Sequence, residues 1–293
     1  MACPPRPGGP AVIAAWAQLL RVSAVLTVPG DAFAGTVAGG RAPGRGTLLA
    51  AGSSLCLYEA GMALNDWADR ETDAVERPDR PLPSGRIAPA SALAAAGLLT
   101  GAGLAVAARA GRPALATATA LAGAVWAYDL HLKNTRWGPL TMGTARALNI
   151  GLGAAASIPG AASGPGGGRT GDVLRTAALM GAHTVAVTTV SREEVQGGSP
   201  LPPLTGLAAV AGITGATARR SPAAAAAYAV TAARPLFHAA LNPSPPLLQK
   251  AVGGGIRAMI PLQSALSGKS PAAVALLGLL PLARRLSRKV SPT

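Results

Sequence analysis

The sequence predicts an all-α protein, a polytopic bundle of transmembrane helices, and three observations lead to this prediction. Of the 293 residues, 49% are hydrophobic and only 13% are charged, with a mean hydropathy of +0.35. Soluble domains carry roughly a quarter charged residues. The charged residues are also segregated between long apolar runs, which a codon bias toward alanine and glycine would not produce. No alternating apolar and polar pattern supports membrane strands, so the backbone must satisfy its hydrogen bonds within helices.

Ten apolar stretches can be drawn along the chain, and most approach the roughly 20 residues that a helix needs to cross a hydrocarbon core of about 30 Å. They lie near residues 11–29, 47–64, 90–108, 113–128, 138–158, 173–190, 202–218, 222–240, 248–267 and 271–283. The weakest is 248–267, which contains three consecutive glycines and Arg257. We therefore expect nine transmembrane helices if that stretch is re-entrant and ten if it crosses, within one domain over residues 1–293.

Two polar loops, at residues 65–89 and 191–203, follow the second and the sixth apolar stretch. Because four spans separate them, both loops should open on the same side of the membrane. Basic residues near span ends favour the cytoplasmic side. The arginines of the first loop and the basic cluster at 284–289 give a weak bias toward a cytoplasmic N-terminus. We expect a multi-pass protein of the cytoplasmic membrane with both loops facing the cytoplasm.

The formal net charge of +14 raises the question of a nucleic-acid partner. Such binding needs a basic face on a soluble module. Here the basic residues lie between apolar runs, and no run is interleaved with aromatic residues that could stack on bases. The sequence therefore favours membrane lipids and an anionic substrate as partners, and no nucleic acid. It leaves the oligomeric state open.

Three aspartates follow the second apolar stretch at spacings of three and four residues. Asp66, Asp69 and Asp73 would share one face of a helix. Residues 66–79 hold six of the chain's 12 acidic residues, so the cluster is not an ordinary solvated loop. Carboxylate oxygens suit Mg²⁺, which binds proteins through one or two carboxylates together with substrate phosphates. Asn65 adds a neutral oxygen beside the first carboxylate. The spacing predicts a magnesium site.

Basic residues downstream of the aspartates provide the counterpart for an anion. Arg77 and Arg80 carry guanidinium groups, which can chelate phosphate oxygens as a fork. In the second loop, Arg192 stands beside Glu193 and Glu194, and this acidic pair could complete a two-metal site on the same side of the membrane. A site for a metal-bridged diphosphate needs acidic side chains that bind the cations and basic side chains that bind the anion. The two loops supply both.

These residues resemble the UbiA superfamily of intramembrane prenyltransferases. Residues 65–73 have the NDxxDxxxD form of that family, and residues 77–87 continue in its RPxRPxxxGxI form. Tyr128 and Lys133, after the fourth apolar stretch, are similar to the family's Tyr-to-Lys loop pattern. The resemblance implies a bundle around a lipid-facing chamber, in which Mg²⁺ ions bridge an isoprenoid diphosphate to two acidic motifs. It implies transfer of the prenyl group to an acceptor that the sequence does not identify.

The implied roles divide into three groups. Catalysis falls to Asp66, Asp69, Asp73 and Lys133. Metal binding falls to Asn65, Asp66, Asp69, Asp73, Glu193 and Glu194. Substrate binding falls to Asn65, Arg77, Arg80, Tyr128, Lys133 and Arg192, and also to Arg146 and Asn149, which lie about one turn apart in the fifth apolar stretch near the Lys133 loop.

One position departs from the family pattern. The second motif is usually DxxxD, but its first aspartate is replaced here by Ser191. The run Ser-Arg-x-Glu-Val resembles the divergent EboC-like subgroup. Two further readings therefore stay open: a non-catalytic or transport-linked protein that binds an isoprenoid diphosphate, and an enzyme that moves a phosphorylated group onto a polyprenyl carrier.

Overall fold

A computed structural model describes residues 9–21, 27–157, 170–268 and 278. The prediction of an all-α protein is confirmed, because these residues form eleven α helices and one π-helical turn and contain no strand. The helices are α1 (Gly9–Leu19), α2 (Pro29–Ala38), α3 (Arg45–Ala68), α4 (Arg70–Glu76), α5 (Pro89–Ala110), α6 (Arg112–Ala127), the π turn η2 (Tyr128–Leu132), α7 (Gly138–Ala156), α8 (Thr170–Ser191), α9 (Leu201–Ala218), α10 (Pro222–Leu241) and α11 (Pro245–Leu266).

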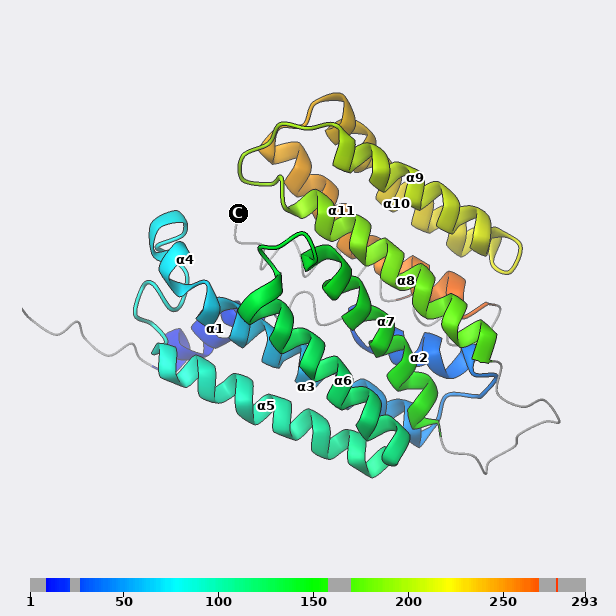
Figure 1. Ribbon diagram of the computed structural model, residues 1–293, viewed down its shortest axis with the longest axis horizontal. Helices are drawn as coiled ribbons and strands as arrows, with labels where there is room; N and C mark the ends of the chain where they lie inside the picture. The colour runs from blue at the N-terminus through cyan, green and yellow to red at the C-terminus, as the bar shows by residue number, and fades with distance from the viewer. Residues whose placement is uncertain (1–8, 22–26, 158–169, 269–277, 279–293) are drawn as a thin grey trace, which may run out of the picture.

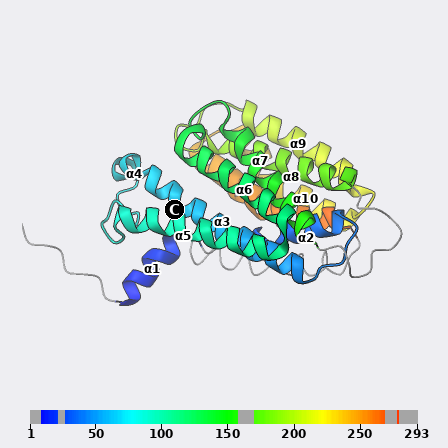
Figure 2. The same cartoon turned by 60° about the horizontal axis from the view of Figure 1, so that its bottom comes forward.

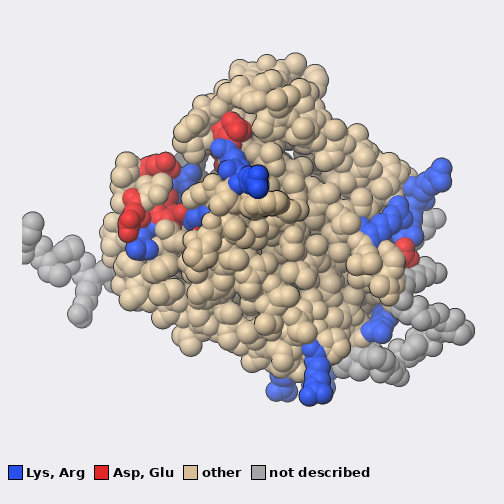
Figure 3. Space-filling view, viewed as in Figure 1, with Lys and Arg blue, Asp and Glu red and all other residues tan. Residues whose placement is uncertain are grey.

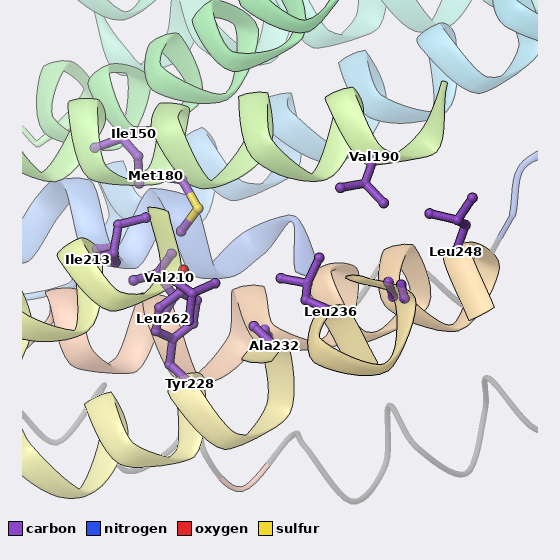
Figure 4. Close-up of a cluster of buried hydrophobic side chains, with 14 residues drawn as sticks. Ile150, Met180, Val190, Val210, Ile213, Tyr228, Ala232, Leu236, Leu248 and Leu262 are labelled. Atoms are coloured by element: carbon purple, nitrogen blue, oxygen red, sulfur yellow. The ribbon is translucent and has the colours of Figure 1, made fainter. Parts of the chain in front are cut away.

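The long helices pack as a bundle in which α7 joins two halves (Figure 1). One half packs α7 and α8 with α9, α10 and α11, around buried side chains that include Ile150, Met180 and Tyr228 (Figure 4). The other half packs α2, α3 and α6 against the same helix, where Leu152 is buried, and α5 packs against α3 and α6. A view turned by 60° shows α1 extending from the bundle below the end that carries α4 (Figure 2).

Small residues let the helix backbones approach closely. A methyl group at Gly35 of α2 would collide with the Ile150 carbonyl of α7, and one at Gly153 would collide with the backbone of Ala32. Between α3 and α5, the Ser53 hydroxyl donates a hydrogen bond to the Gly103 carbonyl at 2.8 Å. Close packing of small residues and hydrogen bonds between helices stabilise bundles in lipid, where the hydrophobic effect cannot drive helix association.

The distribution of side chains is that of an integral membrane protein. Large apolar residues face outward: Leu98 is 76% exposed and Leu174 is 65% exposed, whereas Asp31 and Gln263 are completely buried. In Figure 3 the charged residues gather toward the ends of the molecule, and a broad uncharged surface separates them. In the described part of the chain, α3, α5, α8 and α9 are long and apolar enough to cross a membrane.

One expectation about the spans needs correction. The stretch 11–29 is not one helix: α1 ends at Leu19, Arg21 has a positive φ of 48°, and a new helix, α2, begins at Pro29. Proline favours the first turn of a helix, where its missing N–H costs nothing. Residues 248–266 of the stretch expected to be the weakest lie in the continuous helix α11, which is not among the four described helices that are apolar enough to cross a membrane. Apart from Gly278, the stretch 271–283 lies outside the described residues, so the choice between nine and ten spans stays a prediction.

Candidate functional site

The three aspartates of the first motif lie at the junction of two helices. Asp66 is on the last turn of α3, Asp69 links the helices, and Asp73 is on α4. The helical hydrogen bonds continue through the junction, from the Asp69 N–H to the Asn65 carbonyl at 2.9 Å and from the Asp73 N–H to the Asp69 carbonyl at 2.8 Å. The carboxylates therefore keep the common orientation that their spacing predicts.

Arg80 brings two of these carboxylates together. Its Nη1 lies 2.7 Å from Asp73 Oδ2 and 3.5 Å from Asp66 Oδ1. Arg77 approaches Asp73 at 3.8 Å, and Arg21, in the turn after α1, approaches Asp66 at 3.4 Å. The carboxylates are almost completely buried, whereas the side chains of Arg21 and Arg77 are 41% and 47% exposed. The arginines therefore still present donors to an incoming anion.

The π turn after α6 places Lys133 at the same site. Lys133 Nζ pairs with Asp69 Oδ1. The Lys133 N–H donates to the Tyr128 carbonyl at 2.9 Å, which closes the wide turn, and π turns occur frequently at functional sites. Tyr128 interacts electrostatically with Asp69 and Arg192, so its ring also lies near the cluster.

Asp129 is a site residue that the sequence analysis missed. Asn65 Nδ2 donates to Asp129 Oδ1 at 3.1 Å, which fixes the orientation of the Asn65 amide. Burial raises the pKa of the Asp129 carboxyl to about 7, although the Asn65 hydrogen bond opposes this shift. Its position between Tyr128 and Lys133, directly after an apolar stretch, was the signal that could have indicated it.

The second polar loop meets the first, as the parity of the spans predicts. Arg192 Nη1 donates to the Thr135 carbonyl at 2.8 Å, in the turn that follows η2. Burial raises the pKa of the Glu194 carboxyl above its usual value, and Arg77 opposes that shift from the first loop. The Ser191 hydroxyl donates to the Thr188 carbonyl on its own helix at 2.9 Å. Acidic and basic residues gather at this end of the molecule (Figure 3).

The chemistry of the first motif fits Mg²⁺. Its side-chain donors are carboxylate and amide oxygens, without sulfur or imidazole, and such hard ligands suit this ion. Arg80 already places positive charge between Asp66 and Asp73, and Lys133 places it on Asp69. Within the described residues, no group of three or more acidic, histidine or cysteine side chains is close enough to enclose a metal. The first motif would hold Mg²⁺ through its carboxylate and amide oxygens together with the phosphate oxygens of a bound ligand.

Arg146 and Asn149 lie in a different polar cluster. Arg146 Nε is 2.8 Å from Asp31 Oδ2, and Asn149 Nδ2 donates to the same oxygen at 2.8 Å. Gln263 Nε2 donates to Asp31 Oδ1 at 2.7 Å, so this network joins α2, α7 and α11. Asn149 also accepts a hydrogen bond from Ser54, which lies twelve residues before Asp66, about 18 Å along α3. The structure does not bring these two residues to the acidic cluster.

A groove of about 520 Å³ also lies away from the acidic cluster. It runs between α7, α8 and α9, and its walls include Leu140, Ala147 and Val185. None of the residues predicted from the two motifs lines it. The groove is therefore not assigned to the site.

Residues 24–275 match the UbiA prenyltransferase family. The chain belongs to this family. Digeranylgeranylglyceryl phosphate synthase from Methanopyrus kandleri is 34% identical over 90 residues, which are 31% of this chain and 33% of that protein. The bacteriochlorophyll synthase 33 kDa chain from Rhodobacter capsulatus is 30% identical over 143 residues, 47% of this chain and 46% of that protein. The matched segments span less than half of either curated relative.

A solved structure extends the comparison to most of the UbiA fold. The apo structure of a UbiA homologue from Aeropyrum pernix K1 aligns with a TM-score of 0.64 at 17% identity, covering 83% of this chain and 96% of that chain. At this identity the likeness establishes the arrangement of helices and nothing about substrates. The acidic motif of this UbiA family member therefore has to be interpreted from its own geometry.

Proposed function

We propose that this protein transfers a prenyl group from an isoprenoid diphosphate to an acceptor within the cytoplasmic membrane, in a reaction that depends on Mg²⁺. The observation that carries the proposal is the convergence of Asp66, Asp69 and Asp73 with Arg80 and Lys133 at one end of the bundle. This arrangement supplies oxygens for a cation and donors for an anion at the same place. The family to which the chain belongs, and the transferases named among its relatives, support the same reaction class.

The residues of the two loops would divide the work on the diphosphate. Arg77 and Arg192 are largely exposed and would bind its outer oxygens. Arg80 and Lys133, which neutralise the aspartates, would turn toward the oxygens on which negative charge develops as the prenyl carbon departs. Preorganised donors aimed at developing charge commonly make the largest contribution to catalysis. Mg²⁺ bound to Asn65 and the aspartates would supply further neutralisation of the leaving diphosphate.

The position of the site favours a reaction protected from water. The acidic cluster begins on the last turn of α3, a helix apolar enough to cross the membrane, so the prenyl chain can extend into the apolar bundle. Excluding water strengthens the electrostatic interactions and prevents capture of a reactive cation. We place the two loops on the cytoplasmic side because of the distribution of arginines along the sequence.

The test uses purified protein in lipid nanodiscs with labelled farnesyl and geranylgeranyl diphosphate, with Mg²⁺ or with EDTA. We expect release of diphosphate that requires Mg²⁺ and that is lost in Asp66→Ala and Asp69→Ala. Glu76→Gln, an exposed substitution on α4, is the matched control and should keep the activity. Activity that survives both aspartate substitutions would contradict the proposed site.

The alternative, a protein that binds the diphosphate without turnover, is favoured by one observation. Ser191 stands where the resemblance implies an aspartate, and its hydroxyl is bound to the Thr188 carbonyl. The second motif therefore offers only the adjacent Glu193 and Glu194 to a second cation. Binding of farnesyl diphosphate that requires Mg²⁺ but yields no released diphosphate would decide for this alternative.

A further inference from the structure

A carboxyl group in the middle of α3 is not explained by the diphosphate site. Glu59 lies fourteen residues after the start of α3 at Arg45 and nine before its end at Ala68. Its Oε2 atom is buried and has no hydrogen-bond partner within the described residues. An ionisable residue at this depth in a membrane helix is costly, and such residues commonly mark a substrate pathway.

Glu59 shares a face of α3 with Asp66. The two residues are seven positions apart, which is almost two full turns, and so Glu59 lies about 10 Å farther into the bundle. The other faces of α3 are occupied by helix packing. Ser53 bonds to α5, and a methyl group at Gly61 would meet Val125 of α6 at 2.9 Å. On the face that carries Glu59 and Asp66, Glu59 has a buried carboxyl oxygen without a hydrogen-bond partner among the described residues.

Two arginines act electrostatically on the residue next to Glu59. Tyr58, the neighbour of Glu59, interacts electrostatically with Arg21, Glu59 and Arg146. Arg21 also contacts Asp66 at 3.4 Å, so it connects the diphosphate site with the level of Glu59. Arg146 is held by Asp31, as described above, and does not form an ion pair with Glu59. Among the described residues, Glu59 therefore keeps a carboxyl oxygen without a partner, next to Tyr58 and its two arginines.

We propose that Glu59 is a further catalytic residue, which binds the hydroxyl group of the acceptor and takes its proton. This inference rests on the proposed function. As the allylic C–O bond breaks, the diphosphate leaves with the electron pair. A lone pair of the acceptor oxygen forms the new bond to the allylic carbon, and the hydroxyl proton passes to the Glu59 carboxylate. The allylic carbon is the first atom beyond the diphosphate, so with the prenyl chain extending into the bundle it would lie between the levels of Asp66 and Glu59.

The experiment separates donor binding from transfer. Wild-type protein, Glu59→Gln and Glu59→Asp in nanodiscs receive labelled farnesyl diphosphate and Mg²⁺, with a long-chain alcohol, an alkylglycerol, a phenol or water alone as acceptor. We expect Glu59→Gln to bind the donor within about twofold of wild type, and kcat for the preferred acceptor to fall about 10²- to 10⁴-fold, the usual contribution of a general base. Glu59→Asp should give an intermediate rate, because it keeps the carboxylate with a shorter reach.

Each other result is decisive. Unchanged turnover in Glu59→Gln would overturn the inference and leave the proposed function intact. Loss of donor binding together with turnover would also overturn it, because Glu59 would then support the diphosphate site or the fold. Wild-type protein that binds the donor but transfers it to no acceptor would overturn both proposals. Glu76→Gln, which removes an exposed carboxylate from α4, should match wild type throughout.

Discussion

Two clusters of ion pairs in this protein differ in how far their side chains are exposed to the surface. Around Asp31, every partner is provided by α2, α7 and α11, and the carboxylate is completely buried. Around Asp66 and Asp73, the partners come from a polar loop and the arginines remain partly exposed. The donors to Asp31 are enclosed within the bundle, where Gln263 Oε1 is itself buried without a hydrogen-bond partner among the described residues, whereas the donors around Asp66 and Asp73 reach the surface. From this difference we propose that Asp31 organises the fold and that the loop cluster around Asp66, Asp69 and Asp73 binds the substrate.

The largest effect on stability should come from breaking the buried cluster around Asp31. Asp31→Ala leaves the Arg146 charge buried without its partner, since the Arg146 side chain is only 12% exposed. We expect the free energy of unfolding to fall by about 3–5 kcal/mol, measured by thermal unfolding in detergent. Asp172→Ala is the control, because its partner Arg220 is half-exposed, and it should cost about 1 kcal/mol or less. Equal costs for the two substitutions would remove the distinction between the clusters.

Lys133 tests the loop cluster, where we expect a large loss of activity and a small change in stability. Lys133→Ala removes a donor to the diphosphate, and we expect the turnover of farnesyl diphosphate to fall about 10²- to 10³-fold. The unfolding temperature should change little, because Asp69 is 29% exposed and can be hydrated. Asn134→Ala, at the exposed neighbouring position, should preserve both quantities. A large loss of stability in Lys133→Ala would show that this cluster is structural too.

Asn149 tests whether the buried cluster around Asp31 also contacts the substrate. The sequence analysis predicts such a contact for Asn149. Asn149→Ala removes a hydrogen bond from both Asp31 and Ser54. We expect a loss of about 1–3 kcal/mol in stability, the usual cost of leaving buried polar groups unsatisfied. The KM for the isoprenoid diphosphate should stay within about twofold of wild type. A tenfold rise in KM without a loss of stability would return Asn149 to the substrate site.

The same contrast explains what could be predicted from the sequence. The aspartates of the first motif were found because their spacing is local and fixed by the geometry of a helix. The partners of Asp31 were not found, since Asp31 and Gln263 are 232 residues apart and no periodicity connects them. The spacing of Arg146 and Asn149 correctly places them one turn apart, but it does not indicate which neighbour that face of α7 meets.

Backbone conformation was a second limit. Apolar composition continues through residues 11–29, so hydropathy predicts one helix there. The chain instead breaks after α1, and Arg21, near the break, adopts a left-handed conformation. This turn brings Arg21 to Asp66, and hydropathy carries no information about such a contact. Asp129 was overlooked for a related reason, because only the π turn η2 brings it to Asn65.

The smallest expected effect concerns the second motif, in which Ser191 stands in place of an aspartate. This motif lies beside the loop cluster and has no counterpart in the buried cluster around Asp31. Ser191→Asp would add a carboxylate beside Glu194, on the loop that interacts with Arg77. One added charge near a protein surface changes cation binding by about 1 kcal/mol. We therefore expect the Mg²⁺ concentration for half-maximal activity to fall about threefold to tenfold, measured by titration at constant ionic strength.

Ser199→Asp provides the matched control, because it adds the same charge to the same loop. Ser199 accepts a hydrogen bond from the Leu201 N–H at the start of α9, and aspartate can keep that interaction. An equal response of both variants to Mg²⁺ would indicate a general effect of charge. A response confined to Ser191→Asp would place a cation at the second motif, because only a carboxylate at the start of that loop would then have acted as a ligand.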